Sequence, residues 1–416
     1  MRKKLLALLA VLSFVFLPAS AWASVFGDGY ELQQVTVFSR HGVRSPLYGA
    51  DSFAVRATPH KWLPWTAVPG ELTLKGGAAE VLMGEYFRLW LEDEGLIPSH
   101  YVPGEGEVRL YANSFQRTIA TARFFGAGFL PMGDTRVEYH YGINERDPVF
   151  MHDMNFTPEL KEKVAQEMQQ GDLPGKMAAL QQDADKVMEI LDYPKSKAGK
   201  EQPLIKAADY TLDMGKSLSI KGQIRELHRA ADALTLQYYE ERDDRKAAFG
   251  HAMSPADWQA VGRVAYFTLD SFFLTPTYGA VYARPLLAAM EEEMENPRRK
   301  FSLFCGHDLN MSTLLPPLGV EDYTLSGSIP PKTPLGGKIV ISRLKGQDGR
   351  EYGDLRLVYA NVQDIRSLTP LTLEHPAQMY QLKLKGLKAN KDGLYRWEDV
   401  QKRFREAIAA GEKYTK

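Results

Sequence analysis

The sequence predicts an α/β protein with a mixed, mostly parallel sheet flanked by helices and with an inserted all-helical cap domain. Three strand-like runs, Val35–Ser39, Val108–Ala112 and Phe301–Cys305, each lead into a charged or polar segment. A helical pattern follows the second and third runs, and this alternation of strands and helices favours parallel strands. Residues 140–266 instead carry helix signals with few strand signals, so we expect them to form the separate domain.

Residues 1–23 have the composition of a cleavable secretory signal. Three basic residues at positions 2–4 precede an apolar run from Leu5 to Leu17, and Ala21-Trp22-Ala23 forms a small-x-small cleavage site. The apolar run is too short to span a bilayer comfortably, and no later run is long enough. We therefore expect an exported chain that is not attached to a membrane.

The composition indicates a globular protein with two cores. About 393 residues remain after the predicted cleavage, and 44% of the chain is apolar. We divide them into an α/β domain of residues 24–139 plus 267–416 and a cap domain of residues 140–266. The formal net charge of −1 becomes −4 without the basic signal residues, so no basic field indicates nucleic acid. The single cysteine, Cys305, cannot close an intramolecular disulfide and is interpreted as a small core residue.

The segment Arg40-His41-Gly42-Val43-Arg44-Ser45-Pro46 follows the first predicted strand. In open α/β sheets ligands bind outside the carboxyl ends of the strands, where Arg40 and His41 are expected. Arg40 and Arg44 offer guanidinium groups that match phosphate oxygens, and the unprotonated imidazole of His41 is a competent nucleophile. A turn with surface arginines is the alternative for an isolated Arg-His pair, but five specified positions favour a phosphate site.

A scaffold helix and a second strand–helix unit come next. Residues 72–96 have helical spacing, with Thr73 as the cap and Gly95 at the end. Val108–Ala112 then leads to Ser114, the expected N-cap of a helix, and to Arg117 in its first turn. Because a helix N-terminus favours an anion, we expect Arg117 to add a third guanidinium to the phosphate site.

The cap domain is predicted from helix start and stop signals. Thr157-Pro158 begins one helix, residues 177–191 mark a second, and Ser254-Pro255 begins a third. The lysine-rich stretch between them is interpreted as loop-like solvated surface, with a cleft for a polyanionic substrate as the alternative. Its lysines are Lys195, Lys197, Lys200, Lys206, Lys216 and Lys221. Near the first motif, Arg56 and Lys61 are further candidates for contact with a leaving group.

The last part of the chain returns to alternating strands and helices. Phe301–Cys305 leads directly into Gly306-His307-Asp308, so polar residues with catalytic potential follow a third strand. The ends of three strands can build one site from distant segments of the chain. Strands at residues 337–341, 354–358 and 379–384 and a helix at residues 397–408 are expected to complete the sheet and its cover.

The motif Arg40-His41-Gly42-x-Arg44-x-Pro46, together with His307-Asp308, resembles the active-site signatures of the histidine acid phosphatases. Further stretches are most similar to the glucose-1-phosphatase group, among them residues 58–65 and 333–340, whereas Gly42-Val43 is as in phytase-type members. The resemblance implies a fold of the phosphoglycerate mutase-like superfamily, a periplasmic location, and hydrolysis of phosphate monoesters such as glucose 1-phosphate, phytate or both. The implied partner is a small-molecule ester, and the implied assembly is a monomer or a homodimer.

These residues together suit phosphoryl transfer to water. His41 would be the nucleophile and form a phosphohistidine, Asp308 would protonate the departing alcohol, and Arg40, Arg44, Arg117 and His307 would bind the phosphate. The arginines should lower the pKa of His41, and part of Asp308 must stay protonated, so we expect activity on the acid side of neutrality. No metal or cofactor is expected, because no paired His/Asp cluster has ligand spacing in the sequence. A phosphomutase and a phosphate-binding protein without turnover are the alternatives.

Overall fold

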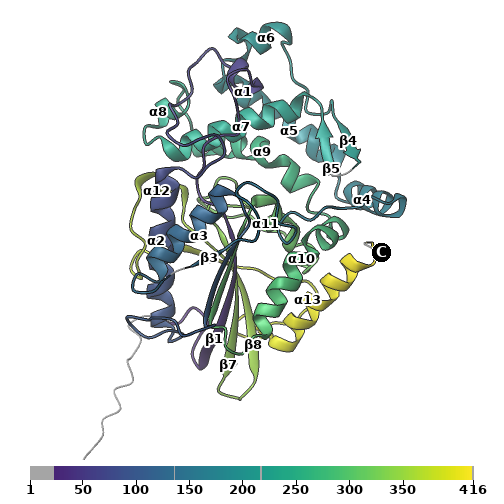
Figure 1. Cartoon of the computed structure of the whole chain (residues 1–416). Helices are drawn as coiled ribbons and strands as arrows, with labels where there is room; N and C mark the ends of the chain where they lie inside the picture. The colour runs from purple at the N-terminus through teal and green to yellow at the C-terminus, as the bar shows by residue number, and fades with distance from the viewer. Residues whose placement is uncertain (1–22, 135, 216–217, 415–416) are drawn as a thin grey trace, which may run out of the picture.

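The computed structural model describes residues 23–134, 136–215 and 218–414. The predicted signal segment, apart from its last residue, lies outside the described residues. A central sheet with helices on both faces forms one domain, and a second, mainly helical domain lies over one end of that sheet (Figure 1). The architecture is therefore α/β with a mixed sheet, as predicted.

Eight strands form the central sheet in the order β10-β8-β7-β1-β6-β2-β3, with β9 also paired to β8. Their bounds are β1 Tyr30–Arg40, β2 Val108–Ala112, β3 Val137–Glu138, β6 Phe301–Gly306, β7 Lys338–Gly346, β8 Glu351–Tyr359, β9 Gln378–Gln381 and β10 Tyr395–Arg396. The four strands β1, β6, β2 and β3 run parallel to one another. All three predicted functional strand ends belong to this parallel half.

The prediction that most strand pairs of the sheet are parallel is wrong. Among the described residues three neighbouring strand pairs are parallel, whereas four are antiparallel. The antiparallel half begins at β7, which pairs antiparallel with β1, and it continues to β8 because a tight turn joins β7 and β8 instead of a crossover helix. The sequence alternation of apolar residues in these strands is the same for both directions of pairing.

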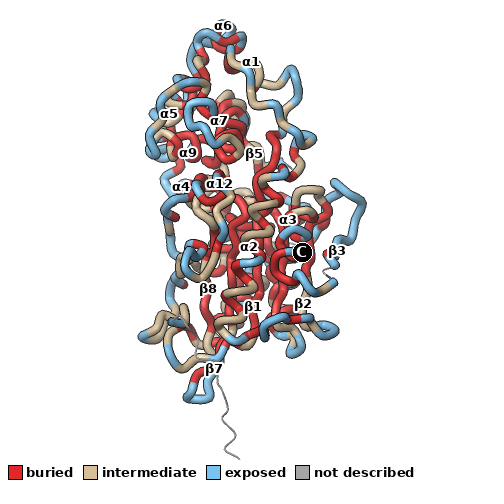
Figure 2. The backbone as a smooth tube through the Cα atoms, turned by 90° about the vertical axis from the view of Figure 1, so that its left-hand side faces the viewer, coloured by how far each residue is buried: buried red, intermediate tan, exposed pale blue. Residues whose placement is uncertain are grey.

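Helices cover both faces of the sheet because successive strand residues point to opposite sides. On one face, α2 (Leu74–Asp93) and α3 (Gln116–Phe129) pack over strand residues that include Val37 and Leu303. On the other, α10 (Pro276–Glu295), α11 (Asp308–Leu314) and α13 (Trp397–Glu412) pack over residues that include Phe38 and Phe304. Figure 2 shows the resulting buried backbone of β1 and β2.

The second domain has its own core around α7, α9 and α5. Its elements are α1 Phe53–Arg56, α4 Pro158–Gln170, α5 Leu173–Ile190, the 3-10 helix η1 Tyr193–Lys195, α6 Lys197–Glu201, β4 Thr211–Met214, β5 Leu218–Lys221, α7 Gln223–Glu240, α8 Asp244–Ala247 and α9 Pro255–Ser271. The β4–β5 pair corrects the prediction of an all-helical cap: the lysine-rich stretch folds in part as a hairpin. The domain also draws α1 from upstream, since α1 packs on α7, and α9 runs on past residue 266.

Most predicted helix starts are confirmed by their caps. The Thr73, Thr157 and Ser254 side chains each accept a backbone N–H three residues on, at the starts of α2, α4 and α9. Ser114 is not the cap of α3: Phe115 holds that position, and the Ser114 hydroxyl instead accepts the N–H of Tyr141. Cys305 is fully buried with a free thiol, which confirms its interpretation as a core residue.

The remaining described element is α12 (Val362–Ser367), which packs beside α2 and α7. Among the helices of the described residues, none combines the length and the apolar character needed to cross a bilayer.

Candidate active site

Three neighbouring parallel strands bring their carboxyl ends to the face that the helical domain covers (Figure 1). Arg40 is the last residue of β1 and stands opposite Gly306 of β6, so His41 and His307 follow at the same level. On the other side of β6, Ala112 of β2 stands opposite Cys305, which puts Asn113 beside His307. The prediction that distant segments meet at one edge is confirmed by this register.

Arg40 and His41 are buried beneath the helical domain. The Arg40 guanidinium is fully buried and donates through Nη2 to the Asp308 carboxylate at 2.9 Å and to the Tyr266 hydroxyl at 2.9 Å. Its Nη1 donates to the backbone carbonyl of Thr333. The His41 Nδ1 lies 2.9 Å from the Gly42 carbonyl, which makes Nδ1 the protonated nitrogen and leaves Nε2 with a free lone pair.

The environment of His41 keeps its imidazole neutral. Burial is the main cause that lowers the pKa of His41 well below its usual range, and the Arg117 and Arg40 guanidinium groups lower it further. The His307 ring lies at 5.6 Å between centroids, in an edge-to-face arrangement. An unprotonated nitrogen nucleophile therefore persists at acid pH, as the sequence analysis expected.

Arg44 and Arg117 complete a set of three guanidinium groups. Arg44 donates to the Asp232 carboxylate of α7 at 3.0 Å. Arg117, in the first turn of α3, lies over the Phe115 ring at 4.8 Å, and its Nε is buried without a hydrogen-bond partner. Burial, with Arg44 as the next cause, lowers the pKa of Arg117 to about 10. Such crowding of like charges is unfavourable without an anion, which indicates that this site is built to receive one.

Asn113 fixes the tautomer of His307. The Asn113 side-chain oxygen accepts the backbone N–H groups of Ser114 and Asp147, so its amide NH₂ must donate to His307 Nε2, at 2.7 Å. The proton of the neutral His307 ring is then on Nδ1, which lies 3.3 Å from Nη2 of Arg117. Two donors converge there with no acceptor between them, and a phosphoryl oxygen would satisfy both.

Asp308 is the first residue of α11 and faces the same space. Its carboxylate is paired with Arg40 and accepts the N–H of Leu309 at 2.8 Å. Burial raises the pKa of Asp308, but Arg40 and Arg44 lower it more, and the net pKa is below the usual value. In the free protein Asp308 is therefore ionised, which differs from the expectation that part of it stays protonated.

A cavity of about 440 Å³ opens from this group of residues between the two domains. Asp232 and Tyr266 line it from α7 and α9, and the Tyr266 hydroxyl lies 3.4 Å from Asp232. Sequence reasoning missed both residues as well as Asn113. The only available signal for Asn113 was its position at a strand end, and Asp232 and Tyr266 lie inside helices whose spacing marks only the buried face. The other lining residues are Arg44, Leu47, Tyr48, His228, Arg229, Ala265, Thr268, Leu269 and Asp308.

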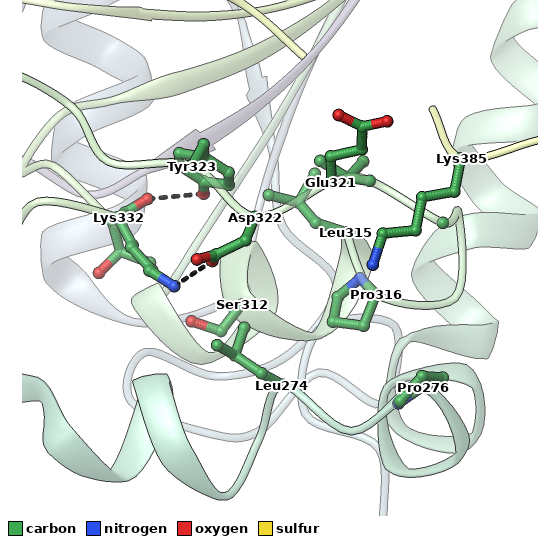
Figure 3. A pocket seen from close by; sticks show the side chains of 13 residues that line it. Leu274, Pro276, Ser312, Leu315, Pro316, Glu321, Asp322, Tyr323, Lys332 and Lys385 are labelled. Atoms are coloured by element: carbon green, nitrogen blue, oxygen red, sulfur yellow. Dashed lines mark hydrogen bonds and ion pairs between the residues drawn. The ribbon is translucent and has the colours of Figure 1, made fainter. Parts of the chain in front are cut away.

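Arg56 and Lys61 do not line this cavity. Arg56 pairs with Glu201 of α6 at 3.2 Å, and Lys61 lines a separate shallow groove beside α8. Another cavity, between α10 and the segment after α11, contains the ion pair of Lys332 with Asp322 (Figure 3). No histidine or cysteine is among its lining residues, so it offers no nucleophile of these types.

Known proteins share both the sequence and the fold. Residues 31–218 match the model of the histidine phosphatase superfamily (branch 2). The chain is 33% identical over 405 residues to a glucose-1-phosphatase of Salmonella typhimurium, covering 94% of this chain and 96% of that protein. It is 31% identical over 385 residues to a glucose-1-phosphatase of Providencia rettgeri, covering 91% and 92%.

Among solved structures, the phytase of Citrobacter braakii superposes with a TM-score of 0.82 at 25% identity, covering 92% of this chain and 97% of that one. The chain therefore belongs to branch 2 of the histidine phosphatase superfamily and is an enzyme that hydrolyses phosphate monoesters.

Proposed function

We propose that the chain is an exported acid phosphatase that hydrolyses small sugar phosphates through a phosphohistidine on His41. The observation that carries this proposal is the neutral imidazole of His41, whose free Nε2 lies among the guanidinium groups of Arg40, Arg44 and Arg117, the first two of them buried. Such an arrangement neutralises a phosphate and presents a nucleophile to its phosphorus. The signal-like composition of residues 1–23 supports export, with the periplasm as the expected location.

The reaction would proceed in two steps at one phosphorus atom. Nε2 of His41 attacks the phosphorus, the bond from phosphorus to the ester oxygen breaks, and Asp308 gives its proton to the departing alcohol. Water then gives a proton to the Asp308 carboxylate and attacks the phosphohistidine, which releases phosphate and restores His41. Arg40, Arg44, Arg117 and His307 bind the phosphoryl oxygens in both steps.

Substrate binding would cause Asp308 to take up from solvent the proton that it lacks in the free protein. Three arginines face two carboxylates, Asp232 and Asp308, so the empty site has a net charge of about +1. A phosphate dianion makes the charge negative and competes with Asp308 for Arg40. Both effects raise the pKa of Asp308 and favour its protonated form when the ester is bound.

The cavity chemistry favours an ester with one phosphate over a polyphosphate. Beyond Arg44, the basic side chains that line it among the described residues are Arg229 and His228, and burial lowers the pKa of His228 and so disfavours its charged form. Asp232 and the Tyr266 hydroxyl instead offer acceptors for sugar hydroxyls. Additional phosphate groups would find few cations there. The relatives named glucose-1-phosphatase agree with this preference, and the fold neighbour named phytase makes phytate the second substrate to test.

The test is phosphate release at mildly acid pH from glucose 1-phosphate, phytate and an aryl phosphate, with and without a chelator. We expect release by the wild type, none by His41→Ala, a higher kcat/KM for glucose 1-phosphate than for phytate, and no effect of the chelator on initial rates. Binding of phosphate without turnover would contradict the proposal. Transfer of the phosphoryl group to an added sugar in place of water would instead indicate a phosphomutase.

A further inference from the structure

A group of metal-ligating side chains lies in the helical domain, apart from the residues assigned to phosphate. His60 follows α1, Asp192 lies between α5 and η1, and His251 follows α8, so three separate segments contribute one residue each. The Nε2 atoms of both histidines face the same carboxylate oxygen, Asp192 Oδ2, at 2.7 Å and 3.4 Å. The three donor atoms all lie within 4.8 Å of one another. The sequence could not reveal this group, because its members are 132 and 59 residues apart.

The neighbours of these residues hold them in place. Lys195 donates to the other carboxylate oxygen, Asp192 Oδ1, at 2.9 Å, and this leaves Oδ2 directed at the two imidazoles. The His60 ring stacks on Phe249 with 5.0 Å between centroids and 13° between planes. Since Phe249 precedes His251 by two residues, one aromatic ring orients His60 and anchors the segment that carries the second histidine.

The spacing suits a transition-metal ion. Zinc binds imidazole nitrogen and carboxylate oxygen at about 2.0 to 2.2 Å, which puts tetrahedral ligands about 3.3 Å apart. The observed 2.7 Å and 3.4 Å from Asp192 Oδ2 bracket this value, and the donor atoms all lie within 4.8 Å of one another, so adjustment of the side chains alone would seat the ion. The three side chains are 33%, 22% and 29% exposed, so an ion can enter and water can complete its coordination.

We propose that His60, Asp192 and His251 bind one divalent transition-metal ion of the zinc class. Two imidazoles and a carboxylate favour Zn²⁺, Co²⁺, Ni²⁺ or Cu²⁺ over Mg²⁺ and Ca²⁺, which prefer oxygen ligands alone. The ion links three segments of the helical domain and takes no part in phosphoryl transfer. Trp62 connects this group to the substrate cavity, since it contacts Phe249 at 5.1 Å and the cavity residue Tyr48 at 5.7 Å between ring centroids.

The experiment is a titration of the mature protein, free of any polyhistidine tag and stripped with a chelator, with ZnCl₂ in phosphate-free buffer at about pH 7.5. We expect one Zn²⁺ per chain by calorimetry and a rise of the midpoint of thermal unfolding by about 3 to 5 °C at a hundredfold excess over Kd. Co²⁺ should give the intense visible absorption of a tetrahedral site, and Zn²⁺ should abolish it.

Two variants and a matched control locate the ion. His60→Gln and His251→Gln should each weaken Zn²⁺ binding by at least about 100-fold. His375→Gln should leave it unchanged, because His375 pairs with Asp364 at 3.0 Å but, among the described residues, has no third ligating side chain beside it. Absence of both Zn²⁺ binding and the Co²⁺ spectrum in the wild type would overturn the proposal and leave a hydrogen-bonded cluster. Equal binding by wild type and by folded His60→Gln and His251→Gln would also overturn it.

Discussion

Replacement of Glu80 by glutamine should destabilise the protein strongly, although Glu80 touches no substrate. The Lys338 ammonium is fully buried and donates to Glu80 at 3.0 Å, to Ser39 Oγ at 3.1 Å and to the Gly336 carbonyl at 2.9 Å. Glutamine keeps the volume and one hydrogen-bond acceptor, so Glu80→Gln mainly removes the countercharge. An unpaired buried charge costs about 3 to 5 kcal/mol of unfolding free energy.

The pair also supports the nucleophile loop. Gly42, next to His41, packs closely on this pair, since a Cβ there would lie 3.2 Å from Glu80 Oε1. Movement of Glu80 would therefore displace the backbone that positions His41. We expect Glu80→Gln to lower kcat as well as stability at a temperature where the protein is still folded.

Urea denaturation followed by circular dichroism, with phosphatase activity beside it, measures both effects. The double variant Glu80→Leu/Lys338→Met is the control, because removal of both charges should restore much of the unfolding free energy that Glu80→Gln loses. A Glu80→Gln protein within about 1 kcal/mol of wild type, or a double variant no more stable than Glu80→Gln, would refute the assigned role of the ion pair.

Three further predictions follow from the site. Asp308→Asn should lower kcat for glucose 1-phosphate by a factor of about 10² to 10⁴, and should lower it much less for an aryl phosphate whose leaving group needs no proton. Equal losses of kcat for the two substrates in a steady-state assay would contradict the role of Asp308 as proton donor. Asn113→Asp should move the His307 proton to Nε2, remove a donor to phosphate and lower kcat/KM about 10- to 100-fold. An unchanged inhibition constant for inorganic phosphate would argue against it. Burial lowers the pKa of His228 in the folded state, so unfolded chains bind more protons. The free energy of unfolding should therefore fall as the pH drops below about 6.5, by up to about 1.4 kcal/mol per pH unit. His228→Gln should flatten this slope in urea titrations, and an unchanged slope would exclude His228 as its source.

The sequence was most informative where charged residues directly follow short apolar strands. Arg40 ends such a strand, and His41, His307 and Asp308 lie one or two residues beyond one, so the position of the site at the sheet edge could be predicted before any contact was known. Residues within helices gave no comparable signal. Tyr266 contacts Arg40 only because α9 crosses the strand ends, and helical spacing does not distinguish a buried packing residue from a ligand.

The antiparallel half of the sheet and the buried ion pair could not be predicted from the sequence, for related reasons. Alternation along β7 and β8 is the same for either direction of pairing, so only the short turn between them distinguishes the two. Lys338 and Glu80 are residue types that almost always lie on the surface, and their burial depends on a partner that is 258 positions away in the chain. Contacts of this range arise from the topology and have no local pattern.

The most direct test of the catalytic assignment is the identity of the phosphorylated residue. Wild-type enzyme mixed with a ³²P-labelled aryl phosphate at mildly acid pH and quenched within milliseconds should carry label on His41. A phosphohistidine survives strong alkali and is lost in acid, whereas an aspartyl phosphate is lost in alkali. Label that is stable in alkali, maps to the peptide containing His41 and is missing from His41→Ala is the predicted result. Alkali-labile label, or equal labelling of His41→Ala, would contradict the account.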